Sequence, residues 1–173
     1  MSQIRVINTS LFLLLTFLIQ ESVIARINFP LGGFSLYIAV LMIVLSLEDR
    51  TGSLVFGFIG GLILDLSPAA QSPFGQWALA MTFIGYLFSV NRETVGDFND
   101  RPIAFISLIS FGAAVSMITF LVIGVLLGQN NGGVLRNLTL IFTNSFWTFL
   151  IVPIFIPITL KIRKLLLTNR ERV

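Results

Sequence analysis

Asp65 is the residue whose type and position first raise the question of chemistry in this chain. It lies in the stretch GGLILDLSPAAQSPFG, at the end of an apolar run, where a carboxylate at membrane depth needs a partner. Catalysis by this carboxylate has little support, because the 173-residue sequence contains no histidine and no cysteine. It also contains no phosphate-binding glycine loop followed by lysine and no acidic metal-binding motif. The sequence therefore predicts that the protein is not an enzyme and holds no metal or cofactor.

Three interpretations of Asp65 remain open. In the first, the carboxylate ends one helix and binds the free N–H groups at the start of the next helix, across the turn SPAAQSP. In the second, it belongs to a binding site for a small polar ligand, because irregular backbone at membrane depth must be enclosed by protein or line a wet cavity. In the third, it is an interfacial carboxylate exposed to water. We favour the first, because few cations are expected on that side of the membrane.

A stripe of small residues leads to Asp65. Ser53, Gly57 and Gly61 recur every four residues, so they fall on one face of a helix with 3.6 residues per turn. In lipid, small residues at this spacing allow two helix backbones to approach closely. We therefore expect this helix to pack centrally. The binding residues that we predict, as a helix-packing or partner face, are Gly57, Gly61, Asp65, Phe74 and Gly75.

The other polar and charged residues have structural interpretations. Asn144 lies near the middle of the last apolar segment and should face other helices, and Pro153 and Pro157 should bend that segment. Glu21 is expected to pair locally with Arg26. The clustered acids adjoin arginines on predicted inner loops and are interpreted as solvated charge: Glu48, Asp49, Glu93, Asp97 and Asp100.

The composition indicates which solvent the apolar segments face. Hydrophobic residues make up 55% of the chain and charged residues 11%, whereas soluble domains carry about 25% charge. Loops rich in helix breakers separate six apolar segments, which we interpret as the transmembrane helices of one all-α integral membrane domain over residues 1–173. The predicted spans are 6–25, 31–47, 52–66, 75–90, 103–127 and 138–162, followed by a basic cytoplasmic tail at 163–173.

Lysine and arginine are unevenly distributed about these segments. With the N-terminus in the cytoplasm, nine of the eleven lie on the inner side, and Arg26 and Arg136 lie on the outer side. By the positive-inside rule, this asymmetry predicts six spans with an N-in, C-in orientation. Topology thus explains the net charge of +3, and no nucleic-acid partner is expected. A cleaved secretory signal ending near Ala25 is disfavoured, because the first apolar stretch is as long as a full span.

The run from Gly57 to Leu87 resembles the rod shape-determining protein MreD family. The resemblance depends on a glycine-rich helix that ends in Leu64-Asp65-Leu66, on the pair Phe74-Gly75, and on a helix that ends in Gly85-Tyr86-Leu87. The chain length, the six segments and the short first loop with its proline are also similar to that family. One departure is that Leu31-Gly32-Gly33 follow this proline, where the family often has an acidic residue.

The resemblance implies a non-enzymatic scaffold subunit of the bacterial cell-elongation machinery, located in the cytoplasmic (inner) membrane and supporting lateral peptidoglycan synthesis. The expected partners are an MreC-like bitopic membrane protein and, through it, the peptidoglycan glycosyltransferase and transpeptidase pair. The MreB filament is expected on the cytoplasmic side. All of these contacts would be made by helix faces or loops of a protein embedded in the lipid bilayer.

The MreD fold is also similar to the substrate-binding subunit fold of energy-coupling-factor transporters, which supplies an alternative function. In that alternative, the chain would bind a vitamin or a metal ion for uptake. Those subunits usually dock to their transporter through an Ala-xxx-Ala motif on the first helix, and the first segment here has leucine, phenylalanine and threonine instead. Their pockets also need several converging polar groups, in which the outer half of this chain is poor.

Overall fold

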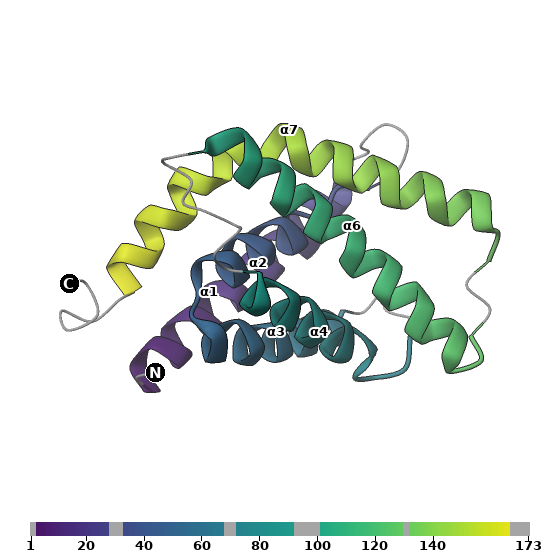
Figure 1. Ribbon diagram of the computed structural model, residues 1–173, viewed down its shortest axis with the longest axis horizontal. Coiled ribbons are helices and arrows are strands. Elements are labelled where there is room, and N and C mark those ends of the chain that lie inside the picture. Colours follow the sequence, from purple (N-terminus) through teal and green to yellow (C-terminus); the bar gives the residue numbers. More distant parts are fainter. Residues whose placement is uncertain (1–2, 28–32, 68–71, 92–100, 130–131, 167–173) are drawn as a thin grey trace.

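The structure, a computed structural model, describes residues 3–27, 33–67, 72–91, 101–129 and 132–166 (Figure 1). The regular elements in these ranges are helices: α1 (Gln3–Ser22), the short 3₁₀ helix η1 (Ile24–Arg26), α2 (Leu36–Leu47), α3 (Arg50–Asp65), α4 (Gln76–Val90), α6 (Pro102–Leu126) and α7 (Val134–Leu166). The helices α1 to α4 form a bundle, and the long helices α6 and α7 form a helical hairpin that packs against it. The start of α1 and the end of α7 lie at the same end of the molecule (Figure 1).

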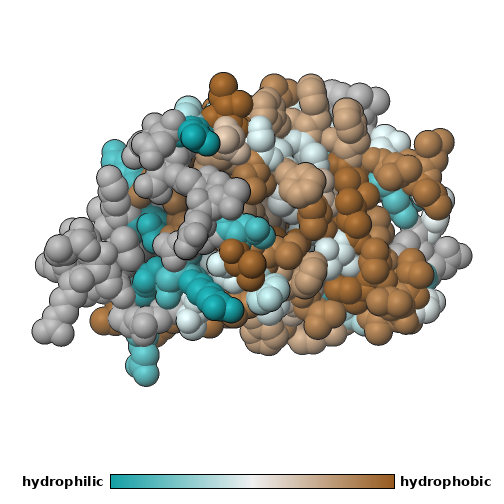
Figure 2. All heavy atoms as spheres, viewed as in Figure 1, coloured by the Kyte–Doolittle hydropathy of each residue, from teal (hydrophilic) through white to brown (hydrophobic). Residues whose placement is uncertain are grey.

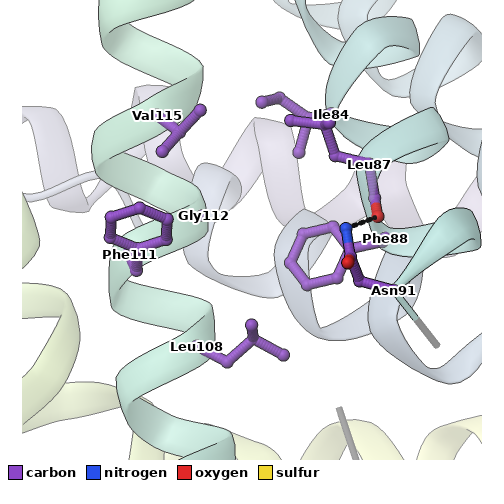
Figure 3. A pocket seen from close by; sticks show the side chains of 8 residues that line it. All are labelled: Ile84, Leu87, Phe88, Asn91, Leu108, Phe111, Gly112 and Val115. Atoms are coloured by element: carbon purple, nitrogen blue, oxygen red, sulfur yellow. Dashed lines mark hydrogen bonds between the residues drawn. The ribbon is translucent and has the colours of Figure 1, made fainter. Parts of the chain in front are cut away.

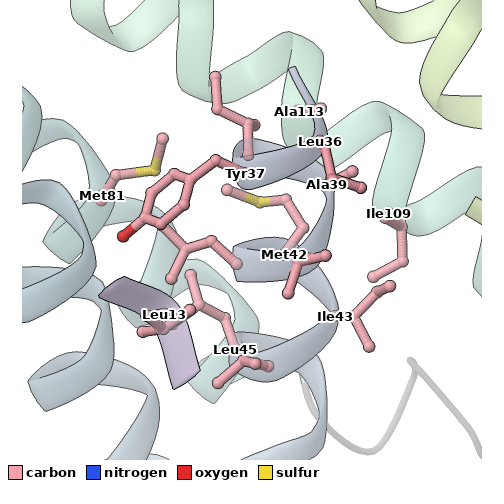
Figure 4. Packing of buried hydrophobic residues seen from close by; sticks show 14 of the residues in the cluster. Leu13, Leu36, Tyr37, Ala39, Met42, Ile43, Leu45, Met81, Ile109 and Ala113 are labelled. Atoms are coloured by element: carbon pink, nitrogen blue, oxygen red, sulfur yellow. The ribbon is translucent and has the colours of Figure 1, made fainter. Parts of the chain in front are cut away.

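Helix α2 occupies the centre of the fold because its sequence is apolar on every side. Ten of its twelve residues are buried, as a helix without a polar face requires. Figure 4 shows Tyr37 and Met42 of α2 among side chains from three neighbouring helices, namely Leu13, Met81 and Ile109. The same core cluster also includes residues of α3 and α7, so the six α-helices described share one core.

The start of α2 is fixed by polar contacts. The Ser35 hydroxyl accepts the N–H of Ile38 at 3.2 Å, and the Gln20 side chain of α1 accepts the first N–H of α2 at 2.8 Å. These two contacts satisfy N–H groups that a helix start leaves without intrahelical partners. At the second residue of α2, the buried Tyr37 hydroxyl donates to the carbonyl oxygen of Gly60 in α3 at 2.9 Å. Together, these contacts join α2 to α1 and α3.

Each of the six predicted apolar segments contains one α-helix. Among the described residues, three helical stretches are long and apolar enough to cross a membrane: Gln3–Arg26, Pro102–Leu126 and Val134–Arg163. Helices α2, α3 and α4 are shorter, with 12, 16 and 15 residues. The second helix begins at Leu36, five residues later than the predicted span, because Ser35 is an extended residue that caps it.

The outer surface of the long helices is apolar. Large exposed apolar side chains include Ile7, Leu11, Leu15, Leu18, Phe111, Val125, Leu126, Phe142, Phe146 and Ile154. Figure 2 shows apolar side chains over much of one face, with polar side chains gathered mainly toward the end that holds the start of α1. Apolar exposure this extensive, together with the three long apolar helices, indicates a membrane protein.

Candidate functional site

Helices α3 and α4 pack backbone against backbone through glycine. A Cβ atom added at Gly57 would lie 2.5 Å from a carbonyl oxygen of α4, and one added at Gly61 would collide with the backbone of Ala78. From the opposite side, Gly85 of α4 lies against the backbone of Ser53. A side chain at any of these three glycines would force the helices apart. The small-residue stripe on α3 is therefore a helix-packing surface directed at α4.

Asp65 binds the start of α4 through three backbone N–H groups. Its Oδ2 atom accepts the N–H of Gly75 at 3.0 Å and that of Ala78 at 3.1 Å. Its Oδ1 atom accepts the N–H of Trp77 at 3.0 Å. A helix leaves its first N–H groups without intrahelical partners, and no side chain at the N-cap position of α4 accepts them. Asp65 therefore has the structural role that the sequence predicts, and the positive end of the α4 dipole favours its charge.

The turn before α4 depends on Gly75. Its φ of +96° lies in the left-handed region, which strains residues with a Cβ atom. The side chain of Phe74, by contrast, is 70% exposed. The structure thus brings Gly57, Gly61, Asp65 and Gly75 together in one hairpin and leaves Phe74 at its surface.

The start of α4 is also tied to α6. Gln76 is 2% exposed, and its Nε2 atom donates to the carbonyl oxygen of Phe120 at 2.8 Å. The neighbouring Trp77 ring stacks on the Phe120 ring, with centroids 4.1 Å apart and an interplanar angle of 17°. The sequence analysis does not identify Gln76 as a joint residue. The sequence signal for this role was an amide side chain at the first position of a mostly apolar helix.

At the other end of α3, Glu48 contradicts the prediction of solvated charge. Its side chain is 2% exposed and forms ion pairs with Arg5 of α1 and Arg163 of α7. The Nε atom of Arg163 lies 3.3 Å from Glu48 Oε1, and its NH2 atom donates to the Leu47 carbonyl oxygen at 2.8 Å. Asp49 keeps a side chain that is 48% exposed. A carboxylate buried at the end of α2 requires paired cations. Since these cations come from α1 and α7, Glu48 joins three helices.

The signal for this ion cluster lies in the ends of the apolar segments. Glu48 directly follows the apolar run of α2, and Arg5 and Arg163 lie near the ends of their own helices on the same predicted side. The remaining acids that we interpret as solvated all fall in a range outside the described residues: Glu93, Asp97 and Asp100.

Glu21 joins α1 to the end of α3. Its Oε1 atom accepts the Ser67 hydroxyl at 3.2 Å, and within the described ranges it forms no ion pair with Arg26. The predicted local pair is therefore wrong. The two side chains do not meet because α1 ends at Ser22 and the chain continues as η1, so Glu21 and Arg26 do not lie on successive turns of one helix.

The polar and proline residues of α7 have the environments that the sequence predicts. Asn144 is buried, and its side-chain nitrogen donates to the carbonyl oxygen of Gly33 at 3.4 Å. The Thr148 hydroxyl donates to the side-chain oxygen of Asn144 at 3.5 Å. The helix continues through Pro153 and Pro157 and bends along its length (Figure 1). Asn144 thus faces the protein and joins α7 to the segment that precedes α2, while its bond with Thr148 lies within α7.

Two apolar grooves flank the contact between α4 and α6. One has a volume of about 400 Å³ and is lined by residues of α4 and α6. The other, of about 600 Å³, also includes one residue of α3. Apolar side chains form most of both linings, in contrast to the converging polar groups of a pocket for a polar ligand.

Comparisons with protein-family models, curated proteins and solved structures find no match for this chain. Its function therefore has to follow from its own residues and contacts. The features available are a helical hairpin closed by Asp65, an ion cluster around Glu48, two apolar grooves and the exposed apolar faces of long helices.

Proposed function

We propose that this protein is a non-enzymatic scaffold subunit of the bacterial cell-elongation machinery that supports lateral peptidoglycan synthesis. The observation that carries the proposal is the α3–α4 hairpin, because residues that give the resemblance to the MreD family also close this hairpin. Asp65 caps α4, Gly75 forms the turn, and Gly85 lies against the backbone of α3. A motif whose residues pack two helices together is consistent with a scaffold protein that binds partners. A catalytic motif would instead place reactive groups beside a cavity.

We further propose six spans with both termini in the cytoplasm. The ion cluster of Arg5, Glu48 and Arg163 supports this topology, because it joins the first, second and last helices at one end of the molecule. Helices of 12 to 16 residues reach only about 18–24 Å at about 1.5 Å per residue, less than the hydrocarbon core of about 30 Å. Helix α2, the shortest of the three, is enclosed by protein along its length, so its own surface does not have to match the bilayer.

The topology can be tested directly because the chain has no cysteine. Single cysteines at two exposed positions, Thr51→Cys and Ile27→Cys, would be reacted with a membrane-impermeant maleimide in intact spheroplasts. Ile27→Cys should react at once, and Thr51→Cys only after the membrane is permeabilised. Reaction of both from the same side would contradict the proposed arrangement.

The proposed partners are an MreC-like bitopic membrane protein and, through it, the peptidoglycan glycosyltransferase and transpeptidase pair, with the MreB filament on the cytoplasmic side. The exposed apolar faces of α1, α6 and α7 support this proposal. In lipid, such faces can accept another transmembrane helix without stripping water from polar groups. The proposed location is the bacterial cytoplasmic membrane.

Two experiments test the function. The affinity-tagged chain should co-purify from host membranes with the MreC-like protein, whereas an unrelated multi-span protein with the same tag should not. Depletion of the chain should turn rod-shaped cells round. Normal rod shape after deletion, together with lost uptake of one vitamin or metal ion, would overturn the proposal in favour of a transport subunit.

A further inference from the structure

The smaller of the two apolar grooves, which we name the α4–α6 groove, is hollowed between two helices rather than filled by side chains. Its volume is about 400 Å³, within the range of about 300–1,000 Å³ typical of ligand cavities. Figure 3 shows the side chains that face one another across it: Ile84, Leu87, Phe88 and Asn91 from α4, and Leu108, Phe111, Gly112 and Val115 from α6.

The floor and the rim of the α4–α6 groove are both apolar. Ile84 and Phe88 are buried in its floor, and the Phe88 ring packs directly against Gly112, 2.9 Å from where a Cβ atom would lie. Phe111 stands at the rim with 67% of its surface exposed. The apolar floor and rim of the α4–α6 groove offer water no hydrogen bonds, so a hydrocarbon chain is the ligand that suits this part of the groove.

One end of the groove has the opposite character. Asn91, on the exposed end of α4, lies there with its amide bonded to the Leu87 carbonyl oxygen at 2.9 Å. Arg101 directly precedes α6, about 10 Å along the helix from Leu108 at about 1.5 Å per residue. Arg101 is exposed, and its guanidinium has no ion-pair partner among the described residues.

The start of α6 adds to this positive charge. Its first turn has no acidic residue, and its N-cap residue, Arg101, makes no capping bond with its side chain. Pro102 at the first helical position has no N–H group, but the N–H groups of the residues that follow it and the positive end of the helix dipole favour an anion there. Arg5 and Arg163 are paired with Glu48, whereas Arg101 directly precedes the helix that lines the groove and can serve an external anion.

We propose that the α4–α6 groove binds one acyl chain of an anionic glycerophospholipid and that Arg101 and the start of α6 bind its phosphate. The apolar lining accounts for the tail, and the cationic end accounts for the charge of the headgroup. A zwitterionic lipid offers the same tail but carries its own cation near the phosphate, so selection depends on Arg101. The assignment of this lipid to the cytoplasmic leaflet rests on the topology proposed above.

The test uses the full chain in phosphatidylcholine nanodiscs that contain a phosphatidylglycerol probe with a diazirine in its acyl chain. After illumination, cross-linked peptides should come from Ile84–Asn91 and Leu108–Val115. A matched phosphatidylcholine probe should label these peptides about fivefold less, which is the effect of one arginine at an anionic lipid surface. Arg101→Gln should abolish this preference, Arg101→Lys should retain most of it, and Arg136→Gln at the other end of α6–α7 should not change it.

A groove-filling variant separates the tail site from the headgroup site. Val115→Trp should lower labelling by both probes several-fold, whereas Leu79→Trp, at an exposed position outside this groove, should not. Circular dichroism and gel filtration would verify that each variant is folded.

Labelling spread evenly over the exposed faces of α1, α6 and α7, or equal labelling by both probes, would overturn the proposal and leave only bulk lipid contact. Nanodiscs expose both leaflets to the same lipids, so their outcome does not depend on orientation. Should Arg101 prove to be extracytoplasmic while the phosphatidylglycerol preference persists, the topology would fail and the lipid site would stand.

Discussion

Replacement of Asp65 by asparagine tests the joint between α3 and α4 with the least change of shape. The carboxylate accepts the N–H groups of Gly75 and Ala78 at Oδ2 and that of Trp77 at Oδ1. An amide has one oxygen atom, so Asp65→Asn retains at most two of these bonds. Its NH₂ group then faces the third N–H, and a donor at the start of α4 loses its acceptor.

The expected cost of Asp65→Asn follows mainly from the lost hydrogen bond. A partly buried donor without an acceptor costs about 1–3 kcal/mol. Removal of the negative charge relieves an unfavourable interaction with the carboxyl end of α3 and loses a favourable one with the start of α4, each of about 0.3–1 kcal/mol, so these two effects largely offset. The free energy of unfolding should therefore fall by about 1–3 kcal/mol. Asp65→Ala, which removes all three acceptors, should cost more.

The assay is a denaturing-detergent titration of the purified protein, monitored by the fluorescence of Trp77. This indole lies next to the joint, because its backbone is bonded to Asp65 and its ring stacks on Phe120. A Trp147→Phe background leaves Trp77 as the sole indole of the chain. The matched control is Glu21→Gln, which can keep its single bond from a serine hydroxyl and should change the unfolding free energy little.

An Asp65→Asn protein that unfolds at the same detergent concentration as the parent would refute this reasoning. It would mean that water satisfies the start of α4, as the interpretation of Asp65 as an exposed interfacial carboxylate requires. An Asp65→Asn protein that is less stable, yet still co-purifies with its partner below its unfolding midpoint, would restrict Asp65 to its structural role.

Three further substitutions probe other contacts in the same titration. Gly61→Ala should lower the free energy of unfolding by at least about 1–3 kcal/mol, because the added methyl group meets the backbone of α4. Gly133→Ala, where no atom lies within 4 Å of the added methyl group, should leave it unchanged. Equal stability of the two variants would argue against backbone contact at Gly61. Glu48→Gln should lower the free energy of unfolding by about 3–5 kcal/mol, because two arginines lose a buried partner charge. Asp49→Asn should lower it far less, because the Asp49 side chain is half-exposed. Similar small losses for both variants would indicate a hydrated cluster. Tyr37→Phe should lose about 0.5–1.5 kcal/mol through its buried hydroxyl bond, seen as a shifted midpoint at unchanged slope.

The positions of the helices follow from the sequence because apolar runs and breakers mark them. The predicted span 103–127 and the observed Pro102–Leu126 differ by one residue at each end. The start of the second helix was less predictable. It is set by the Ser35 hydroxyl and by Gln20, a side chain of another helix. Apolarity indicates where a chain can be buried, but a helix begins where its first N–H groups find acceptors.

The two important carboxylates differ in how far their partners lie along the chain. Asp65 binds N–H groups only 10 to 13 residues away, on the next helix, so the local sequence contains the whole interaction. Glu48 binds Arg5 and Arg163, which lie 43 and 115 residues away. The two residues that follow it, Asp49 and Arg50, are charged and suggest water, so the sequence next to Glu48 does not predict its burial. Only the packing of the first and last helices around α2 brings these partners together.

These carboxylates lie at opposite ends of α3 and fix the bundle in different ways. Asp65 uses backbone N–H groups to hold α4, whereas Glu48 uses guanidinium groups to hold α1 and α7. Helix α2 lies between them with ten of its twelve residues buried, so it offers a partner little surface. Recognition should therefore take place on the outer faces of the long helices. Substitutions there, such as at Phe111 or Leu126, should alter partner or lipid binding while the unfolding free energy stays constant, whereas hairpin substitutions should change both.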